Sequence, residues 1–237
     1  MCILEILLVK SSEYSPVLAS RQCESGQCEG PLPCIFSKVV LSIDLSSNNF
    51  SGSISHFLCK KPWELMDLEI LRLGNNQLSG KLPDCWSNWK NLSIVYLSSN
   101  NFSGNIPSSM GSLIFLQSLH LRSNNLSGEF PLSLQNCTEL FTLDIGGNNL
   151  RGSIPAWIGS KLLKMRILSL RFNEFYGHLP NQLCALSSLQ ILDVSYNYLS
   201  GQIPRCFNNF SAMAQSSDYY ADYFFSQSFP KDLSSNL

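Results

Sequence analysis

Apolar and polar residues alternate along this chain in a frame that recurs about every 24 residues between residues 40 and 213. Within each copy of the frame, L-x-x-L-x-L-x-x-N-x-L-x-G-x-I-P, the first run has period two, which predicts a short strand whose leucines face inward. Because one such strand cannot bury its own apolar face, the repetition predicts parallel strands stacked about 4.8 Å apart and stabilised by neighbouring turns. The copies begin at Val40, Leu68, Leu92, Leu116, Leu140, Met165 and Leu189.

Asparagine, glycine and proline hold fixed positions in the frame. We expect the asparagine amide to bond backbone groups that the bend after each strand would otherwise leave unpaired. The glycine allows close backbone approach, and the Ile-Pro pair opens a second segment on the convex side. These positions predict architecture rather than chemistry. The asparagines are Asn48, Asn76, Asn100, Asn124, Asn148, Asn173 and Asn197, and proline is present in six of the seven copies, with Ser55 in the first.

The 24-residue frame with L-x-G-x-I-P resembles the plant-type leucine-rich repeat, which occurs in extracellular receptors and inhibitor proteins. The resemblance implies an α/β repeat solenoid, a right-handed superhelix with a parallel β-sheet on the concave face and 3-10 or short helical turns on the convex face. The passage IPRCFNNFSAMA at 203–214 is similar to the corresponding passage of receptor-like proteins of the fungal-xylanase-elicitor receptor group. That similarity implies the ectodomain of a receptor-like protein.

Three segments follow from this interpretation. Residues 1–39 are expected to be irregular, with no recognisable cap and a weak signal peptide in MCILEILLVK. Residues 40–213 hold the seven repeats. Residues 214–237 are a non-repeat, island-like tail that ends in a partial repeat, DLSSN at 232–236, so the chain is expected to be a piece of a longer design.

Composition and charge exclude several function classes. The net charge is −1 and only 14% of residues are charged, so no electrostatic footprint for nucleic acid is present. No window approaches the roughly 20 apolar residues of a membrane-spanning helix. The histidines His56, His120 and His178 belong to no nucleophile, phosphate-loop or zinc-protease motif. We expect neither an enzyme nor a cofactor.

Five of the nine cysteines lie in the repeats and separate by their positions there, where each repeat's first residue is position 0, and Cys2, Cys23, Cys28 and Cys34 precede the repeats. Cys59 and Cys184 lie at position 19, and Cys85 and Cys206 lie at position 17 of the following repeat. Two disulfides, Cys59–Cys85 and Cys184–Cys206, are the favoured interpretation, and two pairs of free thiols are the alternative. Disulfides would indicate an oxidising compartment. Cys137 shares its position with apolar residues and is expected to be a buried thiol, whereas the spacing of Cys23, Cys28 and Cys34 fits a metal site poorly.

Six N-x-S/T sequons agree with secretion, although a repeat rich in Asn, Leu and Ser also produces sequons by accident. We expect several of them to carry sugar. They are Asn49, Asn91, Asn101, Asn125, Asn136 and Asn209.

The strand positions outside the frame are predicted to line the concave face, and there the composition varies along the chain. Aromatic and arginine side chains on a rigid sheet are typical interface anchors, and Arg171, Phe172, Tyr196 and Tyr198 form the first candidate patch. The alternative is a solvated face. The full candidate set is Arg72, Tyr96, His120, Arg122, Asp144, Arg171, Phe172, Asp193, Tyr196 and Tyr198.

The resemblance then implies an extracellular module that recognises a peptide, glycan or protein ligand in defence or developmental signalling. A co-receptor kinase at the plasma membrane would transmit the signal. Two alternatives remain: a secreted inhibitor of a pathogen cell-wall-degrading enzyme, similar to the polygalacturonase-inhibiting proteins, and a truncated receptor fragment without function.

Overall fold

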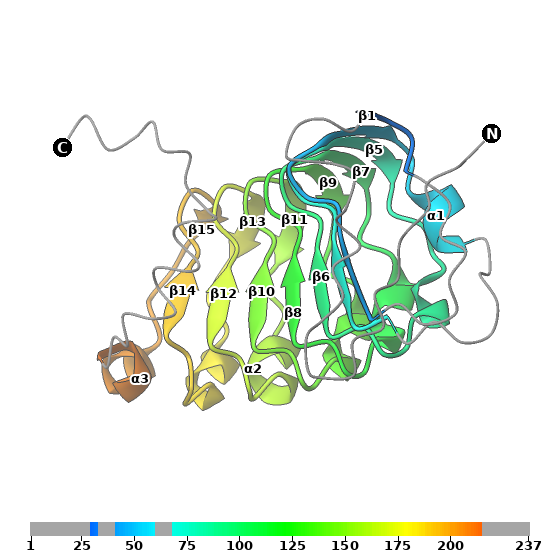
Figure 1. Ribbon diagram of the computed structural model, residues 1–237. Helices are drawn as coiled ribbons and strands as arrows, with labels where there is room; N and C mark the ends of the chain where they lie inside the picture. The colour runs from blue at the N-terminus through cyan, green and yellow to red at the C-terminus, as the bar shows by residue number, and fades with distance from the viewer. Residues whose placement is uncertain (1–28, 33–40, 60–67, 215–237) are drawn as a thin grey trace.

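The computed structural model describes residues 29–32, 41–59 and 68–214. Each copy of the frame forms one coil of a solenoid with three sides, and Figure 1 shows the coils side by side along the molecule. The first side of each coil is a three-residue strand, and these strands form one parallel sheet of seven. The strands of this first sheet are β2 (Ser42–Asp44), β4 (Ile70–Arg72), β6 (Ile94–Tyr96), β8 (Ser118–His120), β10 (Thr142–Asp144), β12 (Ile167–Ser169) and β14 (Ile191–Asp193).

A second parallel sheet, of eight strands, follows the bend in each coil and was not expected from the sequence. Its strands cover the segment around the frame's glycine, where the period-two pattern is too short to be recognised. Their hydrogen bonds run only to neighbouring coils, so the repeat itself creates this sheet. The strands are β1 (Glu29–Gly30), β3 (Asn49–Gly52), β5 (Gln77–Lys81), β7 (Asn101–Gly104), β9 (Asn125–Gly128), β11 (Asn149–Ser153), β13 (Glu174–Gly177) and β15 (Tyr198–Leu199).

The third side consists of short helical turns, as predicted for the convex face. Proline immediately precedes four of the five 3-10 turns, where its fixed φ and missing N–H are tolerated. The 3-10 turns are η1 (Trp86–Asn88), η2 (Ser108–Ser112), η3 (Leu132–Asn136), η4 (Asn181–Ala185) and η5 (Arg205–Asn209). The α-helical turns are α1 (Ser55–Cys59), α2 (Trp157–Lys161) and α3 (Ser211–Ala214), and none of the described helices has the length and apolar character needed to cross a bilayer.

The frame asparagines bond backbone groups at the bend, as expected. Asn148 is 7% exposed, and its Nδ2 donates to the carbonyl oxygens of Leu121, Ile145 and Gly146 at 2.9–3.1 Å. Its Oδ1 accepts the backbone N–H of Leu126, in the preceding coil, at 3.0 Å. The other coils repeat this arrangement, so a ladder of buried amides ties each bend to the coil before it.

The core is a single apolar column formed by the frame leucines, and it runs the length of the solenoid. It begins earlier than predicted. The expected irregular segment 1–39 contains β1, which pairs in parallel with β3, and Leu32, which is 7% exposed within the core. The weak signal peptide, the cysteines Cys2, Cys23, Cys28 and Cys34, and the partial repeat at 232–236 lie outside the described residues.

Candidate functional site

The outward face of the first sheet carries one continuous row of side chains. Strand register places Asp44, Arg72, Tyr96, His120, Asp144, Ser169 and Asp193 directly opposite one another, strand after strand. The flanking leucines point into the core because side chains alternate along each strand. Five of the ten predicted contact residues therefore lie in this row.

An ion pair lies at each end of the row. Arg72 Nη1 lies 3.8 Å from Asp44 Oδ2, and Arg171 Nε lies 3.7 Å from Asp193 Oδ2. Both pairs are partly exposed, so each contributes little to stability. They do fix the position of two guanidinium groups on the face.

Tyr96 and His120 pack against each other in the middle of the row, with ring centroids 5.3 Å apart. The Tyr96 ring lies across Gly74 of the preceding coil, where an added Cβ would come within 2.0 Å of the ring. His120 Nε2 lies 2.7 Å from Ser118 Oγ. Burial, reinforced by the charge of Arg72, lowers the pKa of His120 from 6.5 to about 4. His120 is therefore neutral at neutral and mildly acidic pH.

Asp144 is only 2% exposed and does not present a ligand-contact surface, contrary to the sequence prediction. The Asp144 Oδ1 accepts the Gly146 N–H at 3.1 Å. Burial raises the pKa of Asp144, although this hydrogen bond and the charge of Arg122 act in the opposite direction. Arg122, also predicted as a contact residue, thus has an electrostatic partner beneath the face.

Arg171, Phe172 and Tyr196 form a compact group, called here the aromatic patch. The Phe172 and Tyr196 rings are stacked at 4.1 Å, and the Arg171 guanidinium carbon lies 4.5 Å and 5.5 Å from their centroids. Phe172 is 45% and Tyr196 66% exposed. The patch is the only stacked pair of exposed aromatic rings on the described part of this face.

The backbone conformation of the aromatic patch is unusual. Position 7 of every coil has positive φ because the chain bends there, and five coils fill it with Ser, Asn or Gly. Phe172 and Tyr196 adopt φ values of 52° and 53°, although bulky residues rarely occupy this region. Each therefore costs about 1–2 kcal/mol relative to a permissive backbone conformation.

Tyr198 lies on β15 of the second sheet rather than in the row, contrary to its prediction as a concave-face residue. There it pairs in register with Tyr176 on β13, which sequence reasoning missed. The two side chains are 72% and 55% exposed. Tyr176 could have been recognised from the sequence, because it occupies position 11, which is serine in most coils. The exposed aromatics of the last two coils thus extend from the first sheet to the second.

Both predicted disulfides are confirmed. Cys59–Cys85 and Cys184–Cys206 are bonded, each with 5.6 Å between Cα atoms, and each links adjacent coils on the helical side. Cys137 is a fully buried thiol, as predicted, and burial raises its pKa to about 11.

The sequon asparagines differ in exposure. Asn91, Asn101, Asn125 and Asn136 are exposed, whereas Asn49 is half-buried and its Oδ1 accepts a hydrogen bond from Gln77. The side chain of Asn209 lies outside the described set. Which of these asparagines carry sugar stays a prediction.

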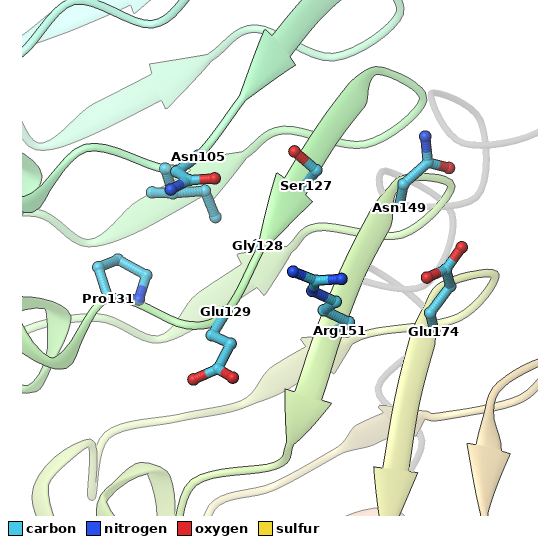
Figure 2. Close-up of a pocket in the computed structure, with 9 residues that line it drawn as sticks. Asn105, Ser127, Gly128, Glu129, Pro131, Asn149, Arg151 and Glu174 are labelled. Atoms are coloured by element: carbon cyan, nitrogen blue, oxygen red, sulfur yellow. The ribbon is translucent and has the colours of Figure 1, made fainter.

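A polar hollow of about 690 Å³ opens on the outer face of the second sheet, over β9, β11 and β13 (Figure 2). It is called here the β9–β13 hollow. Side chains of both charge signs line it. Its lining comprises Asn105, Ile106, Ser127, Gly128, Glu129, Pro131, Asn149, Arg151 and Glu174. Within the described ranges, no group of three or more His, Cys, Asp and Glu side chains could hold a metal ion.

Comparison with known proteins identifies the repeat. A family model described as Leucine Rich Repeat matches residues 40–60, 67–89, 91–113, 115–137, 139–161 and 188–210. Receptor-like protein 31 of Arabidopsis thaliana is 43% identical over 47 residues, which are 20% of this chain and 5% of that protein.

Two solved structures of plant receptor kinases share the fold. The LRR ectodomain of the membrane receptor kinase GASSHO1/SCHENGEN3 from Arabidopsis thaliana, in complex with CASPARIAN STRIP INTEGRITY FACTOR 2, is 38% identical with a TM-score of 0.70. The match covers 78% of this chain and 22% of that one. The Arabidopsis receptor kinase HAESA, in complex with the peptide hormone IDA and the co-receptor SERK1, is 36% identical with a TM-score of 0.65. That match covers 70% of this chain and 27% of the receptor, so this chain spans only a small part of each relative.

Proposed function

This chain belongs to the leucine-rich-repeat family, and we propose on that premise that it is an extracellular ligand-recognition module of a plant receptor-like protein. Its ligand is a peptide, bound across the first sheet for defence or developmental signalling, and a co-receptor kinase transmits the signal. The similarity to the receptor kinase HAESA, which was solved with a peptide hormone, supports a peptide over a glycan. The two disulfides are consistent with an oxidising, extracellular location.

The aromatic patch is the observation that carries this proposal. Phe172 and Tyr196 keep a strained backbone and leave large apolar rings in water, and neither feature stabilises the solenoid. Strained residues of this kind cluster at functional sites. Stacked rings with an arginine beside them offer a rigid apolar anchor and a positive charge, which are the groups enriched at binding hot spots.

Binding of the full chain to an array of synthetic plant secreted peptides tests the proposal. The variant combining Phe172→Asn and Tyr196→Asn should lose the bound peptides, because asparagine accepts positive φ but provides no ring. The matched control combines Ser99→Asn and Ser123→Asn, which alter the same position in two earlier coils and should retain binding. Capture that survives the first variant and fails in the second would place the site elsewhere, and an array without any bound peptide would refute the peptide class.

A further inference from the structure

The outer face of the second sheet contains a sequon beside the β9–β13 hollow. We propose that the hollow is a carbohydrate site and that its occupant is the N-linked glycan of Asn125. The inference rests on the proposed extracellular function, because only a secreted chain meets the glycosylation machinery. It gives the glycan of one of the six sequons a binding site on the protein surface.

Asn125 and Ser127 lie on the same face of β9, two residues and about 7 Å apart, while Leu126 between them points into the core. Ser127 is the third residue of this sequon and also lines the hollow. Asn149, another lining residue, donates its Nδ2 to Asn125 Oδ1 at 2.7 Å. This bond holds the amide oxygen, and among the described residues Asn125 Nδ2 makes no hydrogen bond. The nitrogen that receives the sugar therefore starts at the rim of the hollow.

The hollow has the chemistry of a site for a neutral, hydroxyl-rich ligand. Glu129 and Glu174 lie on either side of Arg151 in Figure 2, and Arg151 forms no ion pair with either of them in the described structure. An anion would meet two carboxylates and a cation would meet the guanidinium. Sugar hydroxyls donate to carboxylates and accept from guanidinium and amide N–H groups, so all three charges can be satisfied at once. The volume is within the roughly 300–1,000 Å³ of small-ligand sites.

The neighbouring sequon at Asn101 provides an internal control. Asn101 occupies the same position of its own coil on β7, is exposed, and belongs to the same kind of N-x-S sequence. Neither Asn101 nor Ser103 lines the hollow. Arg151 and Glu174 add charge to the hollow because they replace the serine that all earlier coils carry at position 11 and the asparagine that most earlier coils carry at position 9.

The modification itself is ordinary group transfer. The bond between sugar C1 and the pyrophosphate of a lipid-linked oligosaccharide donor breaks, and a bond from C1 to Asn125 Nδ2 forms. The displaced amide proton leaves with the lipid pyrophosphate, so no oxidant or reductant is required. Once the chain folds, the sugars nearest Asn125 enter the hollow.

The test is glycopeptide mass spectrometry on the full chain secreted from plant cells. We expect both Asn125 and Asn101 to be occupied, with the Asn125 glycan retained in the oligomannose form because docking shields it from trimming, and the Asn101 glycan trimmed. The variant combining Arg151→Ala and Glu174→Ala should keep Asn125 occupied and make its glycan as trimmed as that of Asn101. Both substituted side chains are exposed, so folding is unaffected.

Two further measurements complete the test. Asn125→Gln should lower the Tm by roughly 2–4 °C, as expected for about 1 kcal/mol in a chain of this size, whereas Asn101→Gln should leave it unchanged. Soluble diacetylchitobiose should bind the Asn125→Gln variant and not the glycosylated chain, because the glycan blocks the site. An unoccupied Asn125, equal trimming at the two asparagines, or equal sugar binding by both proteins would overturn the proposal. Peptide binding at the aromatic patch is measured independently, so either inference can fail alone.

Discussion

The middle coils, residues 92–164, and the last two coils, residues 165–210, use the same frame in opposite ways. In the middle coils the bend positions are the small residues Ser99, Ser123 and Gly147, and Asp144 is only 2% exposed. In the last two coils the same bend carries Phe172 and Tyr196, which project into solvent. The residue type at this one bend position thus separates small side chains in the middle coils from exposed aromatic rings in the last two. Changes at the buried polar groups of the middle coils should mainly affect stability, and changes of Phe172 and Tyr196 should mainly affect the proposed binding.

The largest effect is expected from Asn148→Ala in the middle coils. The substitution removes three donated hydrogen bonds and leaves the buried Leu126 N–H without its acceptor, so the free energy of unfolding should fall by roughly 3–5 kcal/mol. Urea unfolding measures this. Asn197→Ala, which loses an equivalent set of bonds in the more exposed last coil, should cost clearly less. Equal losses at the two sites would contradict the proposed difference in burial.

Removing the Cys184–Cys206 disulfide is expected to have the next largest effect. Replacing both cysteines with serine should lower the free energy of unfolding by roughly 3 kcal/mol, the value expected for a closed loop of about this length. The Cys59–Cys85 pair closes a loop of similar length and should cost nearly the same. Thermal unfolding under reducing and oxidising conditions checks the result. A variant that is as stable as the parent would show that packing alone holds the last coils.

The pH dependence of stability should depend on His120 in the middle coils. Below pH 6.5 the unfolded chain binds a proton at this residue that the folded chain, with its pKa of about 4, does not bind. The associated stability is therefore lost as pH falls from 6.5 towards 4, by about 2 kcal/mol after allowance for the partly exposed ring.

Two variants isolate this effect, again by urea unfolding at a series of pH values. His120→Gln should abolish the loss. The raised pKa of Asp144 acts with the opposite sign, since its folded form takes up a proton at higher pH, and Asp144→Asn should therefore steepen the remaining acid dependence. An unchanged pH profile in His120→Gln would refute the assignment.

The smallest stability change is expected at the aromatic patch. Phe172→Asn loses a stacked pair worth about 0.5–1.5 kcal/mol and relieves about 1–2 kcal/mol of backbone strain, so the net change should be below about 1 kcal/mol. The reciprocal change, Ser123→Phe in the middle coils, introduces the strain without a stacking partner and should destabilise by about 1–2 kcal/mol. Calorimetric Tm values compare the two. A strong loss of stability in the Phe172→Asn variant would show that the stacked rings stabilise the fold and are not kept for binding.

Much of the fold and part of the site could be predicted from the sequence. The asparagine ladder and both disulfides follow from position in the repeat, because a residue at one position has the same backbone geometry around it in every coil. The exposure of individual face residues could not be predicted in this way. Asp144 and Asp193 share position 4, yet the first is buried and the second is not, since burial depends on the side chains of the adjacent coils. Tyr198 was misplaced for a related reason: the bend, whose geometry the period-two pattern does not reveal, transfers it to the second sheet.

The sequence by itself determined the coil, its period and the polar groups that close each bend, because these are local patterns repeated seven times. Only the tertiary structure decided where the second sheet forms, which face residues are buried, and that Phe172 and Tyr196 stack in a strained conformation. It also placed Ser127, Asn149, Arg151 and Glu174 around one hollow. These features arise between coils, from hydrogen bonds and contacts over separations of more than 20 residues, and no single copy of the repeat contains them.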